Sequence, residues 1–212
     1  MDKQTLINYW KENYTFTIPE FDAFNEIDRE DFILPELREI AYQDRPLPIL
    51  RGKTISQPTT VMIMTHALEL NPGDKVFEVG SGSGYQTALI SKLIGSKGKI
   101  ITTEVLPELF QLAKNNLTKT KIINFEIYEA DGSKGMKDKS PFDKIMITAA
   151  CNDFPEELLE QLKSGGIIVA PIGNKDEQNM LKGIKQADGS LEIETLGSFL
   201  FSPLYGIYGF EV

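Results

Sequence analysis

The feature that most constrains the fold is an alternation of strand-like and helix-like segments that begins at Lys75. Apolar runs typical of buried strands alternate with segments whose apolar residues recur at helical spacing. The strand-like runs are KVFEV, KIITTE, NFEIYEAD, FDKIMIT and GGIIVAPIG, and the helix-like segments are YQTALISKLI, Pro107 to Leu117 and PEELLEQL. This alternation predicts an α/β fold, with a mostly parallel sheet and helices on both of its faces.

The two ends of the chain depart from this alternation. Near the C-terminus, LKGIKQADGSLEIETLGSFLF contains two alternating segments around Asp188 and Gly189, and Asp-Gly is a strong signal for a tight hairpin. Before Lys75, TLINYWKENY and DREDFILPELREIAY look like amphipathic helical pieces, and QDRPLPILRG is an extended segment broken by proline. We therefore expect one domain over residues 1–212, in which residues 1–74 form a helical and extended lid and residues 75–212 form the sheet and a closing antiparallel hairpin.

Composition argues against several classes of function. Cys151 is the only cysteine and His66 the only histidine, so we expect both to be structural, with no metal site and no Ser/His/Asp hydrolysis. A net charge of −9 opposes binding to nucleic acid, whose phosphates are neutralised by clustered Lys and Arg. No segment reads as a signal sequence, and no run approaches the ~18 apolar residues of a membrane span. These features predict a cytoplasmic protein without a nucleic-acid or membrane partner, and we also expect a monomer, although composition does not determine the oligomeric state.

A glycine-rich turn joins the first strand to the first helix of the alternating region. Its members are Gly80, Ser81, Gly82, Ser83 and Gly84. Such a turn leaves the backbone open to a ligand at the end of a strand. A dinucleotide-binding turn has a third glycine three places after the second, where this chain has Tyr85. The large ring argues against NAD or FAD, and it favours a cofactor without a pyrophosphate, such as S-adenosyl-L-methionine, bound by residues 75–212.

Acidic residues near this turn complete the expected cofactor pocket. Glu104 ends the second strand, and 104 − 82 = 22 residues separate it from Gly82, which is close to the spacing of a carboxylate that binds ribose hydroxyls. The alternative for Glu104 is a helix cap. Glu78, inside the first strand, needs partners if it is buried, and we expect it to hold loop amides or the cofactor's ammonium group. Asp131, followed by Gly132, is expected to reach the adenine edge, unless it only forms an Asx turn.

Between Leu47 and Leu204 the chain contains, in this order, the motifs LPI, TISQP, EVGSGSGYQTA, EADGS, PFDKIMITAA, LLEQLKSGGIIVAPIG and FSPL. Through these motifs the sequence resembles the protein-L-isoaspartate O-methyltransferases across nearly the whole chain. The resemblance implies a Rossmann-like sheet of seven strands and adds Thr148, in PFDKIMITAA, to the cofactor-binding residues. It also implies methylation of the free carboxylate of L-isoaspartyl residues, and of D-aspartyl residues, in damaged peptides and proteins. This methylation would be the first step of their repair.

The segment TISQP is far more specific to this family than the glycine turn. The resemblance places Ser56 beside the transferred methyl group and the substrate carboxylate, with Thr54 and Ile55 shaping the same wall. From its positive charge, we expect Lys53 to contribute to binding of that carboxylate. The alternative for Ser56 is a helix cap, although Pro58 at the first helical position would put the cap at Gln57. Two departures bear on substrate choice: Lys53 stands where the family usually has Gln, and Leu50 where it has Gly.

Three other functions remain open from the sequence. The first is methylation of another class of substrate, such as tRNA, against which the acidic charge counts. The second is methylation of aspartates in one dedicated peptide, without a repair role. The third is a non-catalytic module that binds S-adenosyl-L-methionine as a sensor.

Overall fold

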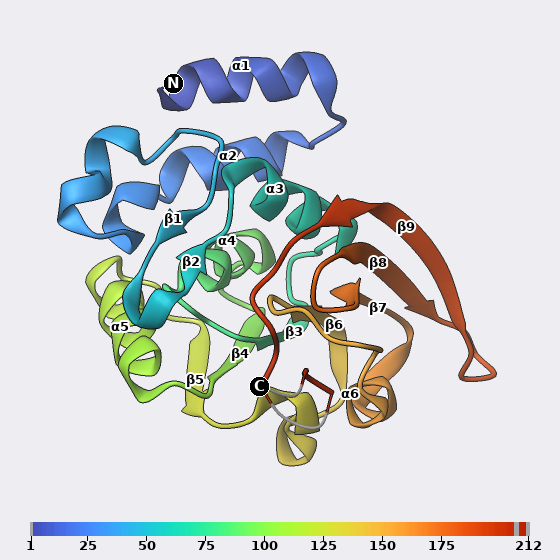
Figure 1. The fold of residues 1–212 in the computed structure, drawn as a ribbon. Helices are drawn as coiled ribbons and strands as arrows, with labels where there is room; N and C mark the ends of the chain where they lie inside the picture. Colours follow the sequence, from blue (N-terminus) through green and yellow to red (C-terminus); the bar gives the residue numbers. More distant parts are fainter. Residues whose placement is uncertain (1, 206–207, 211–212) are drawn as a thin grey trace.

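A computed structural model describes residues 2–205 and 208–210, and a seven-stranded sheet forms its centre (Figure 1). The strands are β3 (Lys75–Val79), β4 (Lys99–Glu104), β5 (Phe125–Glu129), β6 (Phe142–Ile147), β7 (Leu162–Gly173), β8 (Gln178–Lys185) and β9 (Leu191–Phe199). They lie in the order β5-β4-β3-β6-β7-β8-β9. The pairs from β5 to β7 are parallel, and β7–β8 and β8–β9 are antiparallel. The predicted mostly parallel, Rossmann-like sheet is thus confirmed.

Helices cover both faces of the sheet, as the alternation predicts. The helices are α3 (Pro58–Ala67), α4 (Tyr85–Ile94), α5 (Pro107–Lys119) and α6 (Glu156–Gln161). Two short 3₁₀ turns, η4 (Gly132–Lys134) and η5 (Lys137–Lys139), lie between α5 and α6 in the chain. Val76 belongs to the same buried hydrophobic cluster as Ile90 of α4, whereas Phe77, the next residue of β3, belongs to the cluster that contains Leu158 of α6. Since successive side chains of a strand point to opposite faces, α4 and α6 lie on opposite sides of the sheet.

The segment before β3 is built from helices and short strands. It contains α1 (Lys3–Asn13), α2 (Ile18–Glu26), η1 (Arg29–Phe32), η2 (Pro35–Ile40), β1 (Leu47–Pro48), η3 (Leu50–Gly52) and β2 (Thr54–Ile55). The helix expected at TLINYWKENY is α1. Helix α2 was not predicted, although Thr17 and Glu20 form a capping box at its start. The second expected helical piece forms only 3₁₀ turns, because Pro35 interrupts it and fixes the preceding residue in an extended conformation.

These N-terminal elements share a hydrophobic core with the central helices. Trp10 of α1 and Phe24 of α2 are fully buried in one cluster that also contains Leu89 of α4 and Leu117 of α5. In Figure 1, α1 and α2 lie beyond α3 at one end of the molecule, and the chain descends from them through β1, turns, and returns through the antiparallel strand β2 to α3. The segment thereby brings the end of β2 to the edge of the sheet where β3 and β4 also end. None of the helices in the described ranges has the length and apolar character needed to cross a membrane.

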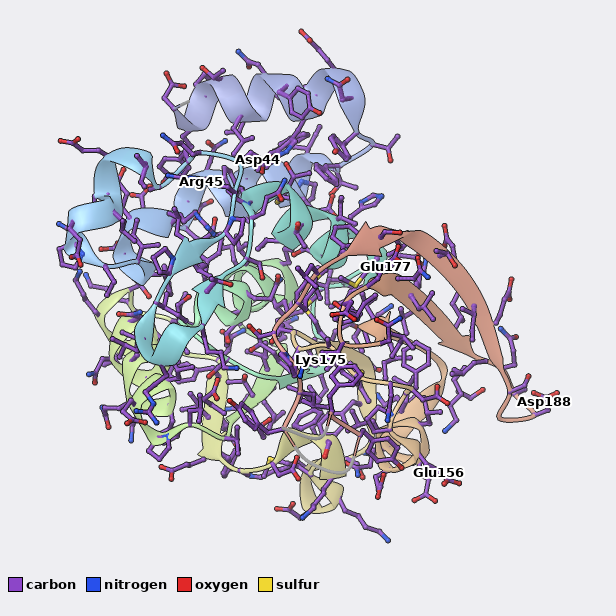
Figure 2. The ribbon with its side chains drawn as sticks, in the orientation of Figure 1. Asp44, Arg45, Glu156, Lys175, Glu177 and Asp188 are labelled. Carbon is purple, nitrogen blue, oxygen red and sulfur yellow. The ribbon has the colours of Figure 1, made fainter. Side chains whose placement is uncertain are left out.

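The expected hairpin closes the sheet. Asp188 Oδ1 accepts hydrogen bonds from the backbone N–H of Ser190 at 3.0 Å and from its hydroxyl at 2.7 Å, and Gly189 has φ of +88°. An Asp-Gly pair suits such a turn, because glycine adopts positive φ without strain. Figure 2 shows Asp188 at the tip of the hairpin, which projects away from the rest of the molecule.

Candidate active site

A cavity of about 690 Å³ lies at the carboxyl ends of β3, β4 and β6. In open α/β sheets this edge is the usual place for a ligand, and the volume is in the range of small-molecule sites. Of the residues singled out from the sequence, Lys53, Thr54, Ile55, Ser56, Gly80, Ser81, Gly82, Ser83, Glu104, Asp131, Gly132 and Thr148 line the cavity. Glu78 and Gly84 lie outside its lining. The fold therefore gathers two sequence-distant sets, the glycine turn and the TISQP segment, around one space.

The glycine turn adopts a backbone that only glycine takes without strain. The φ angles of Gly80, Gly82 and Gly84 are +92°, +53° and +87°. A Cβ atom on Gly80 would approach Thr148 Oγ1 to 2.6 Å, and one on Gly84 would meet Leu117 of α5 at 3.1 Å. A Cβ on Gly82 would meet only Ile49, at 3.8 Å. The outer glycines thus serve close packing as well as backbone conformation, whereas Gly82 needs glycine chiefly for its φ angle.

Glu104 is buried and accepts three backbone hydrogen bonds. Its Oε2 accepts from the N–H of Gly82 at 3.0 Å, and its Oε1 accepts from Val105 at 2.9 Å and Leu106 at 3.0 Å. Leu106 is the N-cap residue of α5, which has no side-chain cap, so Oε1 holds the residues just before the helix and does not cap it. The other oxygen ties the end of β4 to the glycine turn of β3. Glu104 therefore fixes the turn and also presents a carboxylate to the cavity.

Glu78 lies behind the turn and not at the cavity wall. Its side chain is fully buried, Thr87 of α4 donates a hydrogen bond to Oε2, and Oε1 has no partner within the described residues. Burial raises the pKa of Glu78 to about 7. The carboxyl group links β3 to the first turns of α4, so it supports the glycine turn from beneath.

Asp131 forms an Asx turn and also lines the cavity. Its Oδ1 accepts from the N–H of Ser133 at 3.0 Å and from the Ser133 hydroxyl at 2.7 Å, which caps η4. A Cβ atom on Gly132 would collide with the Thr103 side chain. The structure therefore shows the Asx turn, which shapes the loop after β5, and places Asp131 in the same cavity lining as Glu104, whereas its contact with the adenine edge stays a prediction.

Ser56 does not cap a helix. The N-cap residue of α3 is Gln57, without a side-chain cap, and Pro58 is the first helical residue, as predicted. The free amide of Thr59 instead donates to Asp44 Oδ1 at 2.9 Å, so a residue far away in sequence supplies the cap. This excludes the capping alternative. Ser56 is half-buried at the cavity wall, and its carbonyl oxygen accepts from Arg29 Nη2 at 2.8 Å.

The other residues of the TISQP wall differ in exposure. Ile55 is buried, Thr54 is exposed, and Lys53 is half-buried with its Nζ 4.8 Å from the centre of the Tyr205 ring. Arg51 points to a different contact, a loose ion pair of Nε with Glu108 Oε1 at 3.7 Å. Lys53 is therefore the cation of this loop that lines the cavity.

The far wall of the cavity comes from the segment that contains the FSPL motif. After β9 the chain runs past the opening, and Leu200, Phe201, Pro203, Leu204 and Tyr205 all line it. Phe201 and Leu204 also pack against the hydrophobic core, so each belongs to both the cavity wall and the core. In the sequence, only the neighbouring FSPL motif could have indicated that Tyr205 lines the cavity.

The lone cysteine and the lone histidine lie away from the cavity lining. Cys151 is buried, and burial raises its pKa to about 12, which leaves an unreactive thiol at neutral pH. His66 Nδ1 lies 3.1 Å from both carboxylate oxygens of Glu20 and links α3 to α2. Within the described residues there is no group of three or more His, Cys, Asp or Glu side chains that could hold a metal ion.

Comparison with known proteins identifies the family of this chain. The family model described as protein-L-isoaspartate(D-aspartate) O-methyltransferase matches residues 1–208. A protein-L-isoaspartate O-methyltransferase of Methanopyrus kandleri is 44% identical over 191 residues, which cover 90% of this chain and 84% of that one. One of the same name from Pyrococcus horikoshii is 38% identical over 220 residues, covering 100% of this chain and 99% of that one.

Two solved structures agree with this result. A protein-L-isoaspartate O-methyltransferase superposes with a TM-score of 0.88 at 28% identity, covering 98% of this chain and 67% of that one. A Plasmodium falciparum structure, titled as a putative member in complex with S-adenosyl-L-homocysteine, shares the fold with a TM-score of 0.83 at 24% identity, over 96% of this chain and 97% of that one. On its sequence and on its fold, the chain belongs to the protein-L-isoaspartate(D-aspartate) O-methyltransferase family.

Proposed function

We propose that this protein transfers a methyl group from S-adenosyl-L-methionine to the free carboxylate of L-isoaspartyl residues, and of D-aspartyl residues, in damaged proteins, which initiates their repair. The observation that carries the proposal is the meeting of Ser56 and the glycine turn in one cavity. Family membership supports the reaction and the substrate class. A monomeric state, a cytoplasmic location and the role of residues 1–74 as a lid stay predictions.

The residues around the glycine turn fit the cofactor. Ser81 is buried, and its hydroxyl has no hydrogen-bond partner among the described residues although it lines the cavity, so it is available to a ligand. The proposed binding residues are Gly80, Ser81, Gly82, Ser83, Glu104, Asp131, Gly132 and Thr148, with Glu78 and Gly84 supporting the turn from behind. Glu104 is assigned to the ribose hydroxyls and Asp131 to the adenine edge. When bound, S-adenosyl-L-methionine supplies an electrophilic methyl group on a sulfonium.

The chain's own contribution is positioning. A substrate carboxylate is already ionised at about pH 7, so the reaction requires no general base. We assign to the Ser56 hydroxyl the orientation of one carboxylate oxygen, and to Thr54 and Ile55 the shape of the wall. We assign to Phe201 and Leu204, which line the cavity and pack on the core, the exclusion of water that would otherwise solvate the carboxylate. Orientation and desolvation of this kind can supply a large part of a rate enhancement.

The substrate class can be tested with one labelling experiment. The protein is incubated with methyl-labelled S-adenosyl-L-methionine and, in parallel, an isoaspartyl peptide, its aspartyl twin and bulk tRNA. We expect label on the isoaspartyl peptide alone, and we expect mild alkali to release it as methanol, because the product is a carboxyl methyl ester. Alkali-stable label would exclude a carboxylate acceptor, label on tRNA would establish a different enzyme, and cofactor binding without any labelling would favour a sensor.

Lys53 should influence how the substrate binds. A protein of net charge −9 repels an anionic carboxylate, and Lys53 places a cation on the cavity wall. An ion pair of an incompletely buried lysine contributes about 0.2–1 kcal/mol, so the Lys53→Gln variant should have a KM for the isoaspartyl peptide raised by up to about fivefold. Because salt screens such a pair, KM should rise with ionic strength more in the parent than in the variant.

Arg51→Gln is the matched control for this prediction. It removes the same charge from the same loop, but Arg51 faces Glu108 and does not line the cavity. The KM of Arg51→Gln for the isoaspartyl peptide, measured at low and at high salt, should be close to that of the parent. Equal KM values and parallel salt responses for the parent and the Lys53→Gln variant would show that Lys53 has no part in binding.

A further inference from the structure

Arg29 is a fully buried cation without a carboxylate partner in the described residues. Burial lowers its pKa to about 10, so the guanidinium still carries its charge at neutral pH. The described contacts of this side chain are backbone carbonyls and an aromatic ring, and its Nη1 has no partner among the described residues. Burial of a charge without a counter-ion costs free energy. Since no ion pair offsets this cost within the described residues, the contacts that Arg29 does make indicate its role.

Its contacts join three separate parts of the chain. Nε donates to the carbonyl oxygen of Ala41 at 2.9 Å, and Nη2 donates to the carbonyl oxygen of Ser56 at 2.8 Å. The guanidinium carbon lies 5.3 Å from the ring centre of Tyr85, the first residue of α4 after the glycine turn. The rigid, planar guanidinium holds these directions in a fixed geometry, which a lysine cannot reproduce. Arg29 thus connects the segment that carries Ser56 to the helix that follows the glycine turn.

The segment after Ser56 is fixed from another side. Asp44 Oδ2 accepts from Gln57 Nε2 at 3.0 Å and from the Thr59 hydroxyl at 2.7 Å, and Trp10 Nε1 donates to Thr59 Oγ1 at 2.7 Å. The start of α3 is therefore anchored through its side chains. The carbonyl of Ser56 itself is held by Arg29. Loss of this hydrogen bond would free the backbone at Ser56, and any displacement of its Cα atom would carry the hydroxyl with it.

We infer that Arg29 is a positioning residue, which fixes the backbone of Ser56 so that its hydroxyl is aimed into the cavity beside the glycine turn. This inference rests on the proposed function, in which Ser56 orients the substrate carboxylate. Arg29 does not line the cavity, so it acts through Ser56 and not on the substrate.

The Arg29→Met variant tests the inference, because methionine fills much of the same volume without donors or charge. We expect kcat for the isoaspartyl peptide to fall about ten- to a hundredfold, as expected for misplacement of a group by a fraction of an ångström to 1 Å. Affinity for S-adenosylhomocysteine, measured by calorimetry, should stay within about threefold, because the cofactor residues are untouched. Arg29→Lys keeps the charge and one donor direction, and it should recover part of the lost kcat.

Phe24→Leu is the control for a merely structural role. Phe24 is buried in the same N-terminal core, and its described contacts are with Trp10, Tyr42 and Lys3. This variant should lower the melting temperature and leave kcat near the parent value at temperatures well below melting. If Arg29→Met lowers kcat no more than Phe24→Leu does at a matched loss of melting temperature, Arg29 is structural only.

Hydrogen exchange separates this inference from the proposed function. In Arg29→Met, amide exchange should become faster in residues 54–57 and stay unchanged in residues 78–84. This outcome in a protein that methylates no isoaspartyl peptide would overturn the function and leave the positioning intact. Unchanged exchange in residues 54–57 would overturn the positioning, whatever the activity of the parent.

Discussion

Replacement of Ser56 by alanine should lower the turnover of an isoaspartyl peptide by roughly ten- to a hundredfold and leave affinity for S-adenosylhomocysteine within about twofold. A hydrogen bond to a charged group is worth about 1.5–3 kcal/mol, and ~1.4 kcal/mol corresponds to a factor of ten. The hydrogen bond found at Ser56 is made by its carbonyl oxygen, so loss of the hydroxyl should spare the fold. Steady-state kinetics and calorimetry on the same preparation provide both values.

Two further serine variants sharpen this test. Ser56→Thr keeps a hydroxyl at the cavity wall, so it should retain more activity than Ser56→Ala. Ser190→Ala removes a hydroxyl at the tip of the β8–β9 hairpin, where it bonds only Asp188 in the described structure, and it should have the turnover of the parent. A Ser56→Ala enzyme with the kcat of the parent would remove Ser56 from the reaction and favour a substrate held by other residues.

Local signals predicted the parts of the fold that depend on local chemistry. The parallel sheet follows from the alternation of apolar runs, the hairpin from Asp188 and Gly189, and the first helical residue of α3 from Pro58. The glycine turn was identified because positive φ angles demand glycine, and all three of its glycines have them. Helix α2 could have been found from the capping box of Thr17 and Glu20.

The remaining features depend on contacts between residues far apart in sequence. Asp44 caps α3 from 15 residues away, and Arg29 reaches the Ser56 carbonyl across 27 residues. No local pattern encodes either contact. Glu78 illustrates the same limit: the strand register predicts its burial, but only the packing of Thr87 above it shows that its carboxyl group faces α4 and not the cavity.

A valine at position 82 should abolish cofactor binding and leave a folded protein. Gly82 lines the cavity, and a Cβ atom there would meet only Ile49 at 3.8 Å, so the added side chain would occupy open cavity space beside the turn. Valine at φ +53° is strained by about 1–3 kcal/mol, which is less than the ~5–15 kcal/mol by which native domains are stable. We expect affinity for S-adenosylhomocysteine to fall by more than about a hundredfold in calorimetry, a loss of more than ~2.7 kcal/mol.

Gly189→Val separates the steric effect from the strain. Gly189 also has positive φ, at +88°, and a Cβ atom there would have no neighbour within 4 Å, since it lies at the hairpin tip away from the cavity. This control should lose a similar amount of stability and bind S-adenosylhomocysteine as the parent does. Equal binding by Gly82→Val and the parent, or tight binding of NAD by the parent, would contradict a cofactor seated on this turn. If both valine variants lost the same affinity, the loss would result from backbone strain and not from a side chain in the cofactor site. The reason is that position 189 shares the positive φ of position 82 but does not line the cavity.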